Sequence, residues 1–207
     1  MDTRWKHPFT ACIAGPTGAG KSWFLKKFLE HLPQMCDARF DRVLLYYTEW
    51  QEAYRTEFKV GYSGGSAVPI EFREGLPQRS DYSVDTDKKK LLILDDLMRE
   101  SSNDIVLDLF SRSSHHLNLS VFLVTQNIFH QGKSQRDISL NSKYLVIFKN
   151  PRDKAQIQHL ARQIYPEDSI LFLDLTQAAL DEYRVRTCIF PSDKIQYAYV
   201  PKYAKFR

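Results

Sequence analysis

The sequence predicts an α/β fold: a mainly parallel sheet of five strands flanked by helices, followed by a C-terminal β-hairpin. Two observations support this fold class. Short runs of consecutive apolar residues recur along the chain, and such runs are typical of strands buried on both faces. Between them lie segments whose apolar residues recur at the spacing of an amphipathic helix. This alternation is typical of a parallel sheet covered by helices.

The expected elements follow the chain in order. Strands are predicted at residues 9–14, 43–47, 91–94, 120–124 and 144–148, and the hairpin at 183–190 and 194–200. Helices are predicted at 23–32, from about 101 to 114, at 154–164 and within 167–180. Residues 48–90 are rich in glycine, proline and charge, so we expect one or two helices there, interrupted by loops. Residues 1–8 are expected to form a polar lead-in.

The composition fits one globular domain. We expect a single domain over residues 1–207, with its core at about 9–165 and a C-terminal extension at about 166–207. Hydrophobic residues make up 43% and charged residues 26% of the chain, as in ordinary soluble proteins. The formal net charge of +4 permits a polyanionic partner but does not require one.

Two further features bear on the setting of the protein. Cys12, Cys36 and Cys188 are scattered, which favours reduced thiols in an intracellular protein over a disulfide framework or a metal site. No apolar run approaches the roughly 20 residues that span a bilayer. We therefore expect no membrane association.

The strongest chemical signal is residues 15–22, Gly-Pro-Thr-Gly-Ala-Gly-Lys-Ser, which fit the phosphate-loop pattern G-x-x-x-x-G-K-[ST] between a predicted strand and a predicted helix. The glycines allow a tight turn whose N–H groups, with the start of the helix, can bind polyphosphate oxygens. Lys21 is predicted to reach the β- and γ-phosphates of ATP, and the Ser22 hydroxyl to ligate Mg²⁺. The alternative is a glycine-rich turn that matches by chance. The predicted nucleotide-binding residues are Gly15, Pro16, Thr17, Gly18, Ala19, Gly20, Lys21, Ser22 and Trp23.

Two adjacent acids follow the strand at 91–94. A carboxylate at the C-terminal end of a buried parallel strand lies where open α/β sheets bind their ligands. Asp95 fits the Walker B role of holding Mg²⁺ through coordinated water, and Asp96 that of the neighbouring acid that positions and activates the attacking water. The alternative is that both aspartates merely leave the strand and cap the next helix. The phosphate loop upstream favours the first interpretation.

The strand at 120–124 is followed by Thr125, Gln126 and Asn127. In P-loop proteins that insert a strand between the phosphate-loop strand and the Walker B strand, the inserted strand points a polar sensor side chain at the γ-phosphate. Gln126 is placed for that role. Alternatively, its amide satisfies backbone groups of a nearby loop.

Several blocks together resemble one superfamily. Residues 15–22, 91–96 and 124–126 look like motifs of the FtsK–HerA superfamily of hexameric DNA-pumping ATPases. Further blocks resemble a narrower branch, the genome-packaging ATPases of poxvirus-like large DNA viruses, adintoviruses, Polintons and virophages. These blocks are residues 109–116, 125–133, 138–141 and 148–153. The resemblance runs from about residue 9 to about residue 200 and is poor over 48–90.

The resemblance implies a RecA-like P-loop NTPase core in a homo-oligomeric ring, a hexamer or a pentamer. ATP would be hydrolysed between neighbouring subunits, and double-stranded DNA would be driven through the central channel into a preformed capsid at its portal vertex. The expected setting is the nucleus or cytoplasm of an infected host cell, with association to the virion as a further option.

The resemblance also implies that a neighbouring subunit supplies an arginine to the transition state. Arg112 is the first candidate, followed by Arg136 and Arg152, and an ordinary surface arginine is the alternative for each. The predicted catalytic residues are therefore Lys21, Asp96, Gln126 and Arg112.

DNA contact is expected to be mainly to phosphates, because neither a separate DNA-recognition domain nor a nuclease domain is expected. Candidate contacts in predicted loops are Lys88, Lys89, Lys90, Lys133 and Arg136. Plain surface solubility is the alternative for each. Two other function classes stay open. One is a P-loop kinase for a small molecule or nucleotide, and the other is a slow nucleotide switch that takes part in capsid assembly.

Overall fold

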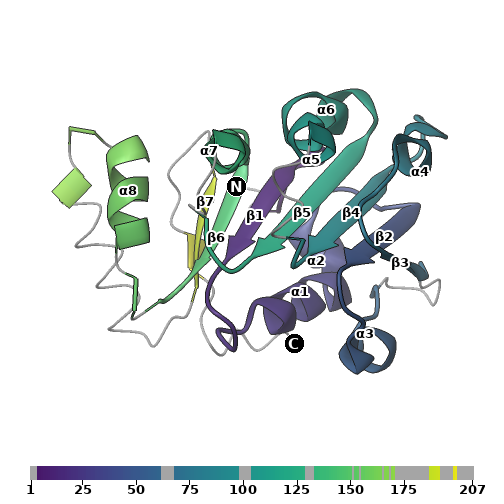
Figure 1. Ribbon diagram of the computed structural model, residues 1–207. Helices are drawn as coiled ribbons and strands as arrows, with labels where there is room; N and C mark the ends of the chain where they lie inside the picture. The colour runs from purple at the N-terminus through teal and green to yellow at the C-terminus, as the bar shows by residue number, and fades with distance from the viewer. Residues whose placement is uncertain are drawn as a thin grey trace.

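The computed structural model describes residues 4–61, 68–97, 104–128, 133–150, 152–153, 155–164, 166–167, 169–170, 187–191 and 198–199. At residues 113, 115, 133–136, 164, 187–191 and 198–199 it describes the backbone alone. The described strands form one sheet with helices on both faces (Figure 1).

The sheet has eight strands in the order β3-β2-β4-β5-β1-β6-β7-β8. The six strands from β3 to β6 run parallel, whereas β7 is antiparallel to β6 and β8 is antiparallel to β7. All residues of β1, β4, β5 and β6 are buried, which explains why their sequences are almost continuously apolar. The strands are β1 Thr10–Ala14, β2 Arg42–Tyr47, β3 Ile70–Glu74, β4 Lys90–Asp95, β5 Leu119–Thr125, β6 Tyr144–Phe148, β7 Thr187–Pro191 and β8 Ala198–Tyr199. The predicted α/β fold with a terminal pair of antiparallel strands is confirmed.

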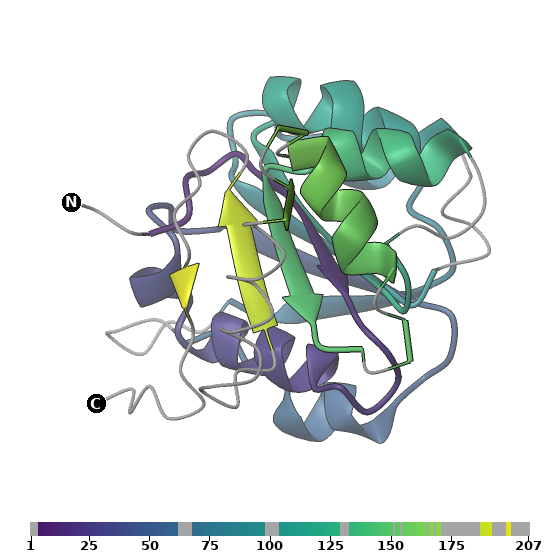
Figure 2. The ribbon, with the colours of Figure 1, turned by 90° about the vertical axis from the view of Figure 1, so that its left-hand side faces the viewer.

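Helices cover the sheet in two layers (Figure 2). One layer consists of α1 (Lys21–Glu30), α2 (Leu32–Met35) and α3 (Glu52–Glu57), whose apolar side chains join one core cluster. The other layer contains α4 (Arg79–Ser83), the continuous segment α5 (Asp104–Asp108), η1 (Leu109–Ser113) and α6 (Ser114–His116), then α7 (Lys133–Leu140) and α8 (Ala155–Ile164).

The strand β4 shows how one strand serves both layers. Leu91 and Ile93 belong to the cluster under α1, while Leu92 and Leu94 belong to the cluster under α5 and η1. Successive side chains of a strand point to opposite faces, so four consecutive aliphatic residues are needed to fill both cores. The apolar run that predicted this strand is therefore a direct consequence of its central position in the sheet.

The sheet has six parallel strands, one more than the five predicted. The additional strand, β3, lies at the edge of the sheet, where only helices and loops were expected. Its Ile70 and Phe72 pack against the core cluster of the α1 face, and charged residues alternate with them. A short edge strand of this kind is partly exposed and lacks the long apolar run that marks the central strands.

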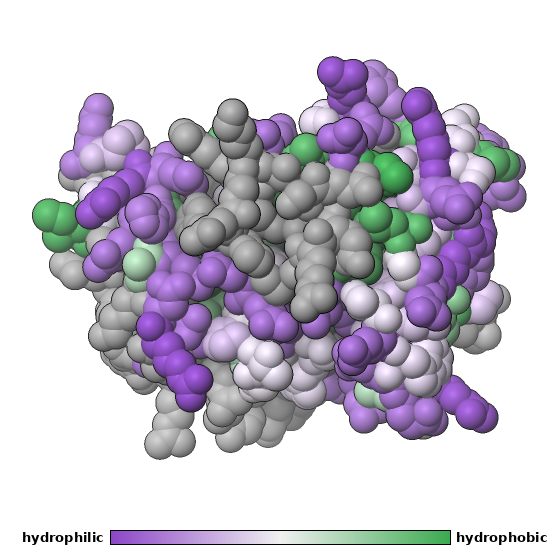
Figure 3. Space-filling model, viewed as in Figure 1, coloured by the Kyte–Doolittle hydropathy of each residue, from purple (hydrophilic) through white to green (hydrophobic). Residues whose placement is uncertain are grey.

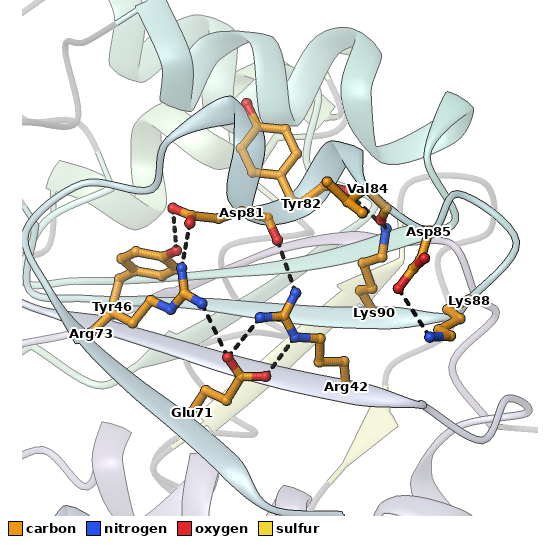
Figure 4. A network of polar contacts seen from close by, with 10 residues as sticks. All are labelled: Arg42, Tyr46, Glu71, Arg73, Asp81, Tyr82, Val84, Asp85, Lys88 and Lys90. Carbon is orange, nitrogen blue, oxygen red and sulfur yellow. Dashed lines mark hydrogen bonds and ion pairs between the residues drawn. The ribbon is translucent and has the colours of Figure 1, made fainter.

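A network of polar contacts connects α4 to this edge (Figure 4). The Arg42 guanidinium donates to both carboxylate oxygens of Glu71, with Nη2 lying 2.7 Å from Oε2. Asp81 of α4 accepts hydrogen bonds from Arg73 and from the Tyr46 hydroxyl, the latter at 2.7 Å. The hydrogen bond from Arg42 is the main cause that lowers the pKa of Glu71. The network thus joins β2, β3 and α4 into one unit.

The N-terminal segment is not the polar lead-in that was expected. Trp5 is only 5% exposed and stacks on the ring of Tyr144, with centroids 4.2 Å apart. Its ring also makes edge contacts with Phe9 and Phe28 at centroid distances of 5.2 and 4.9 Å. The backbone N–H of Trp5 donates to the carbonyl of Met35 at 2.8 Å, which ties the segment to the end of α2. Trp5 is therefore part of the core, although Arg4 and Lys6 beside it are exposed.

Further findings concern the cysteines, the helices and the molecular surface. Cys12 and Cys36 are buried free thiols, and burial raises their pKa values to about 12 and about 11. Among the described helices, none combines the length and the apolar character needed to cross a membrane. Among the described residues visible in Figure 3, most are hydrophilic, with scattered apolar patches. The predicted helix start at 101–103 and most of the helix at 167–180 lie outside the described residues.

Replacing Trp5 with alanine should lower the free energy of unfolding by about 3–5 kcal/mol, the usual cost of truncating a buried large aromatic side chain. Trp23→Ala is the matched control, because Trp23 is 56% exposed. Its truncation should change stability by no more than about 0.5 kcal/mol. Urea unfolding followed by far-UV circular dichroism measures both variants. Equal losses of stability would contradict the assignment of the N-terminal segment to the core.

Candidate nucleotide-binding site

The predicted site residues gather at the carboxyl-terminal edge of the parallel strands, where open α/β sheets bind their ligands. The phosphate loop follows β1, Asp95 ends β4, and Gln126 follows β5. In the sheet, β5 lies between β4 and β1, which is the inserted-strand arrangement expected from the sequence.

The loop at residues 15–20 adopts a conformation that requires glycine. Gly18 and Gly20 have φ angles of 76° and 106°, in the left-handed region that other residues rarely adopt. Gly20 is the N-cap of α1, and its carbonyl accepts the first helical hydrogen bond, from the N–H of Phe24 at 2.9 Å. No side chain caps this helix end, and no acid lies in its first turn. The N–H groups and the positive dipole end of α1 are thus available to an anion.

Phe148, at the end of β6, forms the support on which the loop rests. A Cβ atom added at Gly15 would lie 2.5 Å from the Phe148 Cβ, so no larger residue fits there without displacement. The N–H of Gly15 also donates to the carbonyl of Thr125 at 3.2 Å. The first residue of the loop is therefore fixed by both neighbouring strands, β5 and β6.

Lys21 lies folded over the loop. Its ammonium nitrogen donates to the carbonyls of Gly15 and Pro16 at 2.6 and 3.2 Å. Burial lowers the pKa of Lys21, and the nearby charges of Asp96 and Asp95 oppose this shift. The two acids and the lysine therefore share one electrostatic environment, as the predicted site requires.

Asp95 is a buried carboxylate, 4% exposed, at the end of β4. The Tyr54 hydroxyl, on α3, donates to its Oδ2 at 2.7 Å. Among the described residues, no hydrogen bond reaches the other oxygen, Oδ1. Burial raises the pKa of Asp95, and Asp96 adds to the rise, while the Tyr54 hydrogen bond and Lys21 lower it.

Asp96 is held in an unusual backbone conformation. Its φ of 55° lies in the left-handed region, which aspartate tolerates better than most residues. The Asp96 N–H donates to the Val124 carbonyl at 3.2 Å, and its own carbonyl accepts from Thr48 Oγ1 at 3.1 Å. The Gln126 side-chain amide lies 3.4 Å from Asp96 Oδ1. Backbone strain that is maintained by surrounding contacts is frequent at functional sites.

The residues present fit a magnesium site of the P-loop kind. Within the described part of the chain, no three His, Cys, Asp or Glu side chains lie close enough together to hold a metal. Magnesium, however, usually takes only one or two protein oxygens and completes its shell with water and substrate phosphates. The exposed Ser22 at the start of α1 and the unbonded oxygen of Asp95 are oxygen donors of this type.

Two of the three candidate arginines, Arg112 and Arg152, have exposed side chains. Arg112 is exposed in η1, a π-helical turn, an uncommon geometry that often occurs at functional sites. The segment from α5 to α6 packs on the opposite face of the sheet from α1. Arg152 is exposed just after β6, and the side chain of Arg136 lies outside the described residues.

One predicted DNA contact is wrong. Lys90 is 1% exposed, and its ammonium nitrogen donates to the carbonyl of Tyr82, at 2.9 Å, and to that of Val84, where α4 ends (Figure 4). The Lys90 ammonium group therefore stabilises the fold and is not exposed for contact with DNA. The neighbouring Lys88 and Lys89 are exposed, although Lys88 pairs with Asp85 at 2.9 Å.

Sequence reasoning missed three residues of the site. Tyr54 binds Asp95, Thr48 binds the Asp96 backbone, and Phe148 supports Gly15. Tyr54 and Thr48 lie within residues 48–90, for which the sequence predicted only helices and loops. No local pattern reveals their contacts with Asp95 and Asp96, which are more than 40 positions away in the chain. Phe148 was recognised only as part of a strand. Its position at the end of a strand beside the phosphate-loop strand is the signal that could have identified it.

Comparison with solved structures places this geometry in a known fold. No protein-family model matches the sequence, and no curated protein matches it. The genome packaging NTPase B204 from Sulfolobus turreted icosahedral virus 2, in complex with sulfate, is 13% identical, with a TM-score of 0.62 over 94% of this chain and 97% of that chain. Its complex with ATP-γS gives 12% identity and a TM-score of 0.61, over the same shares of the two chains.

A second protein shares the fold. The cytoplasmic domain of the Thermomonospora curvata Type VII secretion ATPase EccC is 12% identical, with a TM-score of 0.53 over 92% of this chain and 25% of that chain. At these identities the likeness establishes the fold alone. The chain has the fold of RecA-like P-loop NTPases.

Proposed function

We propose that this protein is an ATPase of the FtsK–HerA superfamily that assembles into a ring and drives double-stranded DNA into a viral capsid. The observation that carries the proposal is the arrangement at one edge of the sheet: a phosphate loop, a buried acid, a strained neighbouring acid and a polar side chain from the inserted strand. The match to a genome packaging NTPase over nearly the whole of both chains supports the packaging role.

In this proposal each site residue has a distinct task. The loop N–H groups and Lys21 bind the β- and γ-phosphates of ATP. Ser22 and Asp95 would hold Mg²⁺, which supplies positive charge to the phosphoryl oxygens. Asp96 accepts a proton from the attacking water as ADP leaves, and Gln126, next to Asp96, orients that water.

The pair of acids favours hydrolysis over transfer to an acceptor. A kinase needs room for its acceptor hydroxyl at the γ-phosphate, whereas here a second carboxylate and an amide occupy the end of the adjacent strands. Those two groups suit the positioning of water. As a separate part of the proposal, the protein would work inside an infected host cell, with association to the virion as a further option.

The decisive experiment measures phosphate release with and without duplex DNA. We expect DNA to stimulate release with no phosphorylated acceptor, and DNA affinity to fall steeply with salt without sequence preference. Two double variants, one that removes the charges of Lys88 and Lys89 and one that removes those of Lys133 and Arg136, test the DNA contacts. In each, the slope of the logarithm of DNA affinity against the logarithm of salt concentration should become shallower by about one for each DNA phosphate that is no longer contacted. Arg55→Gln with Lys59→Gln, two exposed charges on the α3 side, is the control. Slow turnover that DNA does not change would favour a switch protein, and a phosphorylated acceptor would favour a kinase.

Lys21→Ala and Asp96→Asn should separate binding from chemistry. Without the Lys21 charge the β- and γ-phosphates have no ammonium partner, so hydrolysis should be abolished and nucleotide binding weakened. Asp96→Asn should keep binding and slow turnover about 10²–10⁴-fold, the usual range for a general base. Asparagine tolerates the left-handed backbone at this position, so the fold is preserved. Calorimetric binding and steady-state turnover measure the two effects, and equally weakened binding in both variants would contradict these roles.

Arg112 is proposed to act in the site of a neighbouring subunit. The transition state spreads negative charge over the γ-phosphoryl oxygens, and an inserted guanidinium typically adds about 10³–10⁵ in rate. Arg112→Ala and Lys21→Ala subunits, each inactive alone, should regain part of the ATPase activity when they are mixed. In a mixed ring some intact Lys21 sites then face an intact Arg112.

The mixing experiment has clear negative outcomes. Absence of recovery in rings shown by mass spectrometry to be mixed would remove Arg112 from the trans role. Recovery with Arg136→Ala or Arg152→Ala subunits in place of Arg112→Ala, and not with Arg112→Ala, would assign the role to that residue.

A further inference from the structure

We propose that Tyr54 is a positioning residue for the metal site: its hydroxyl fixes one oxygen of Asp95, so that the other oxygen is presented to Mg²⁺ and its water. The inference rests on the proposed function, because it assigns the metal to the same site. It adds a residue of α3 to a site that the sequence motifs place on the phosphate loop, the start of α1 and the ends of β4 and β5.

The contact is buried and specific. The Tyr54 hydroxyl donates to Asp95 Oδ2 at 2.7 Å, and the two residues are 1% and 4% exposed. A tyrosine hydroxyl has a single proton to donate, and here that proton is given to one oxygen of the carboxylate. Among the described residues Oδ1 receives no hydrogen bond, so the two oxygens differ in the way a metal-binding carboxylate requires.

Aromatic packing aims the hydroxyl. The Tyr54 ring stacks on Phe72 of β3, with centroids 5.9 Å apart and an interplanar angle of 26°. Phe58 and Trp50 approach it edge-on, at centroid distances of 5.4 and 5.8 Å, and Tyr47 lies at 5.7 Å. Rings just before and just after α3 in the chain, together with rings from β2 and β3, therefore leave the Tyr54 side chain little freedom to turn away from Asp95.

Each of the two buried groups, the Tyr54 hydroxyl and the Asp95 carboxylate, needs the other as its hydrogen-bond partner. A tyrosine hydroxyl inside an aromatic cluster costs free energy unless it finds an acceptor, and a buried carboxylate needs a donor. Partners of this kind, which hold a metal ligand without touching the metal, are known to affect metal affinity strongly. The position of α3 is thereby coupled to the geometry of the Walker B acid.

The chain offers a matched control. Tyr46 is also 1% exposed, and its hydroxyl also donates to an aspartate oxygen, Asp81 Oδ2, at 2.7 Å. This second pair belongs to the network that joins β2, β3 and α4 (Figure 4), and Tyr46 packs in the core cluster on the face of the sheet opposite α1. Tyr54→Phe and Tyr46→Phe each remove one buried tyrosine hydroxyl and its hydrogen bond to an aspartate. Asp81 keeps Arg73 and the Gln78 N–H as donors, so Tyr46→Phe controls for the loss of a buried hydroxyl, and the stability of each variant is measured separately.

The test measures equilibrium binding of a fluorescent ATP analogue, once with Mg²⁺ and once in EDTA. Tyr54→Phe should bind as the wild type does in EDTA, and its increase in affinity with Mg²⁺ should be smaller by about tenfold or more, within the 10–100-fold range for such partners. Tyr46→Phe should keep the full increase. In steady-state turnover, Tyr54→Phe should need more Mg²⁺ for half-maximal rate and recover most of kcat at saturating Mg²⁺.

The outcomes separate the inference from the proposed function. An unchanged effect of Mg²⁺ on affinity in Tyr54→Phe, or an equal reduction in Tyr46→Phe, would overturn the role of Tyr54 while leaving ATP binding intact. Failure of the wild type to bind nucleotide would overturn the proposed function itself. Unfolding midpoints of both variants, measured without nucleotide, show whether either change acts through the fold.

Discussion

The site depends on the register of three parallel strands. Backbone pairing places Asp95 opposite Val124, and Thr125 opposite Ala14, so β4, β5 and β1 end within one residue of each other. The groups that follow these ends must then meet at the same edge. Burial of the sheet on both faces makes this register strict, because a slip of one residue would turn apolar side chains toward the wrong layer. Core packing, which has no chemical role of its own, thus sets the distances on which the chemistry relies.

Several residues of the site are held in energetically unfavourable states. Asp95 is buried although burial raises its pKa, Asp96 adopts a left-handed backbone, and Lys21 is half-buried beside both. Each cost is offset by a specific contact: the Tyr54 hydroxyl donates to Asp95, the Asp96 N–H to the Val124 carbonyl, and the Lys21 ammonium group to the Gly15 carbonyl. Such concentrated exceptions within an otherwise consistent fold are expected at functional sites. They identify this edge independently of any motif.

The sequence predicts the central strands and the phosphate loop because both depend on local pattern. Uninterrupted apolar runs define β4 and β6, and the glycine positions define the loop. The edge strand β3 is missed because charged residues alternate with its two apolar residues and most of it is only partly buried, so it has no continuous apolar run. Trp5 and Lys90 are misassigned since their burial arises from distant partners, Tyr144 and the end of α4. The same reason hides Tyr54, whose role depends on where α3 packs and not on its neighbours in the chain.

The uneven exposure of the site gives a physical reason for a second subunit. Asp95 is buried, whereas Ser22, Asp96 and Gln126 are exposed in the single chain. Electrostatic stabilisation of a charged transition state is most effective where water is excluded and the donors are fixed beforehand. One chain fixes the phosphate loop and the buried acid but leaves Asp96 and Gln126, the residues proposed to position the attacking water, open to solvent. A surface that covers Asp96 and Gln126 and carries a cation would both exclude water and fix a positive charge beside the site. An arginine on a neighbouring copy of the chain would meet both requirements.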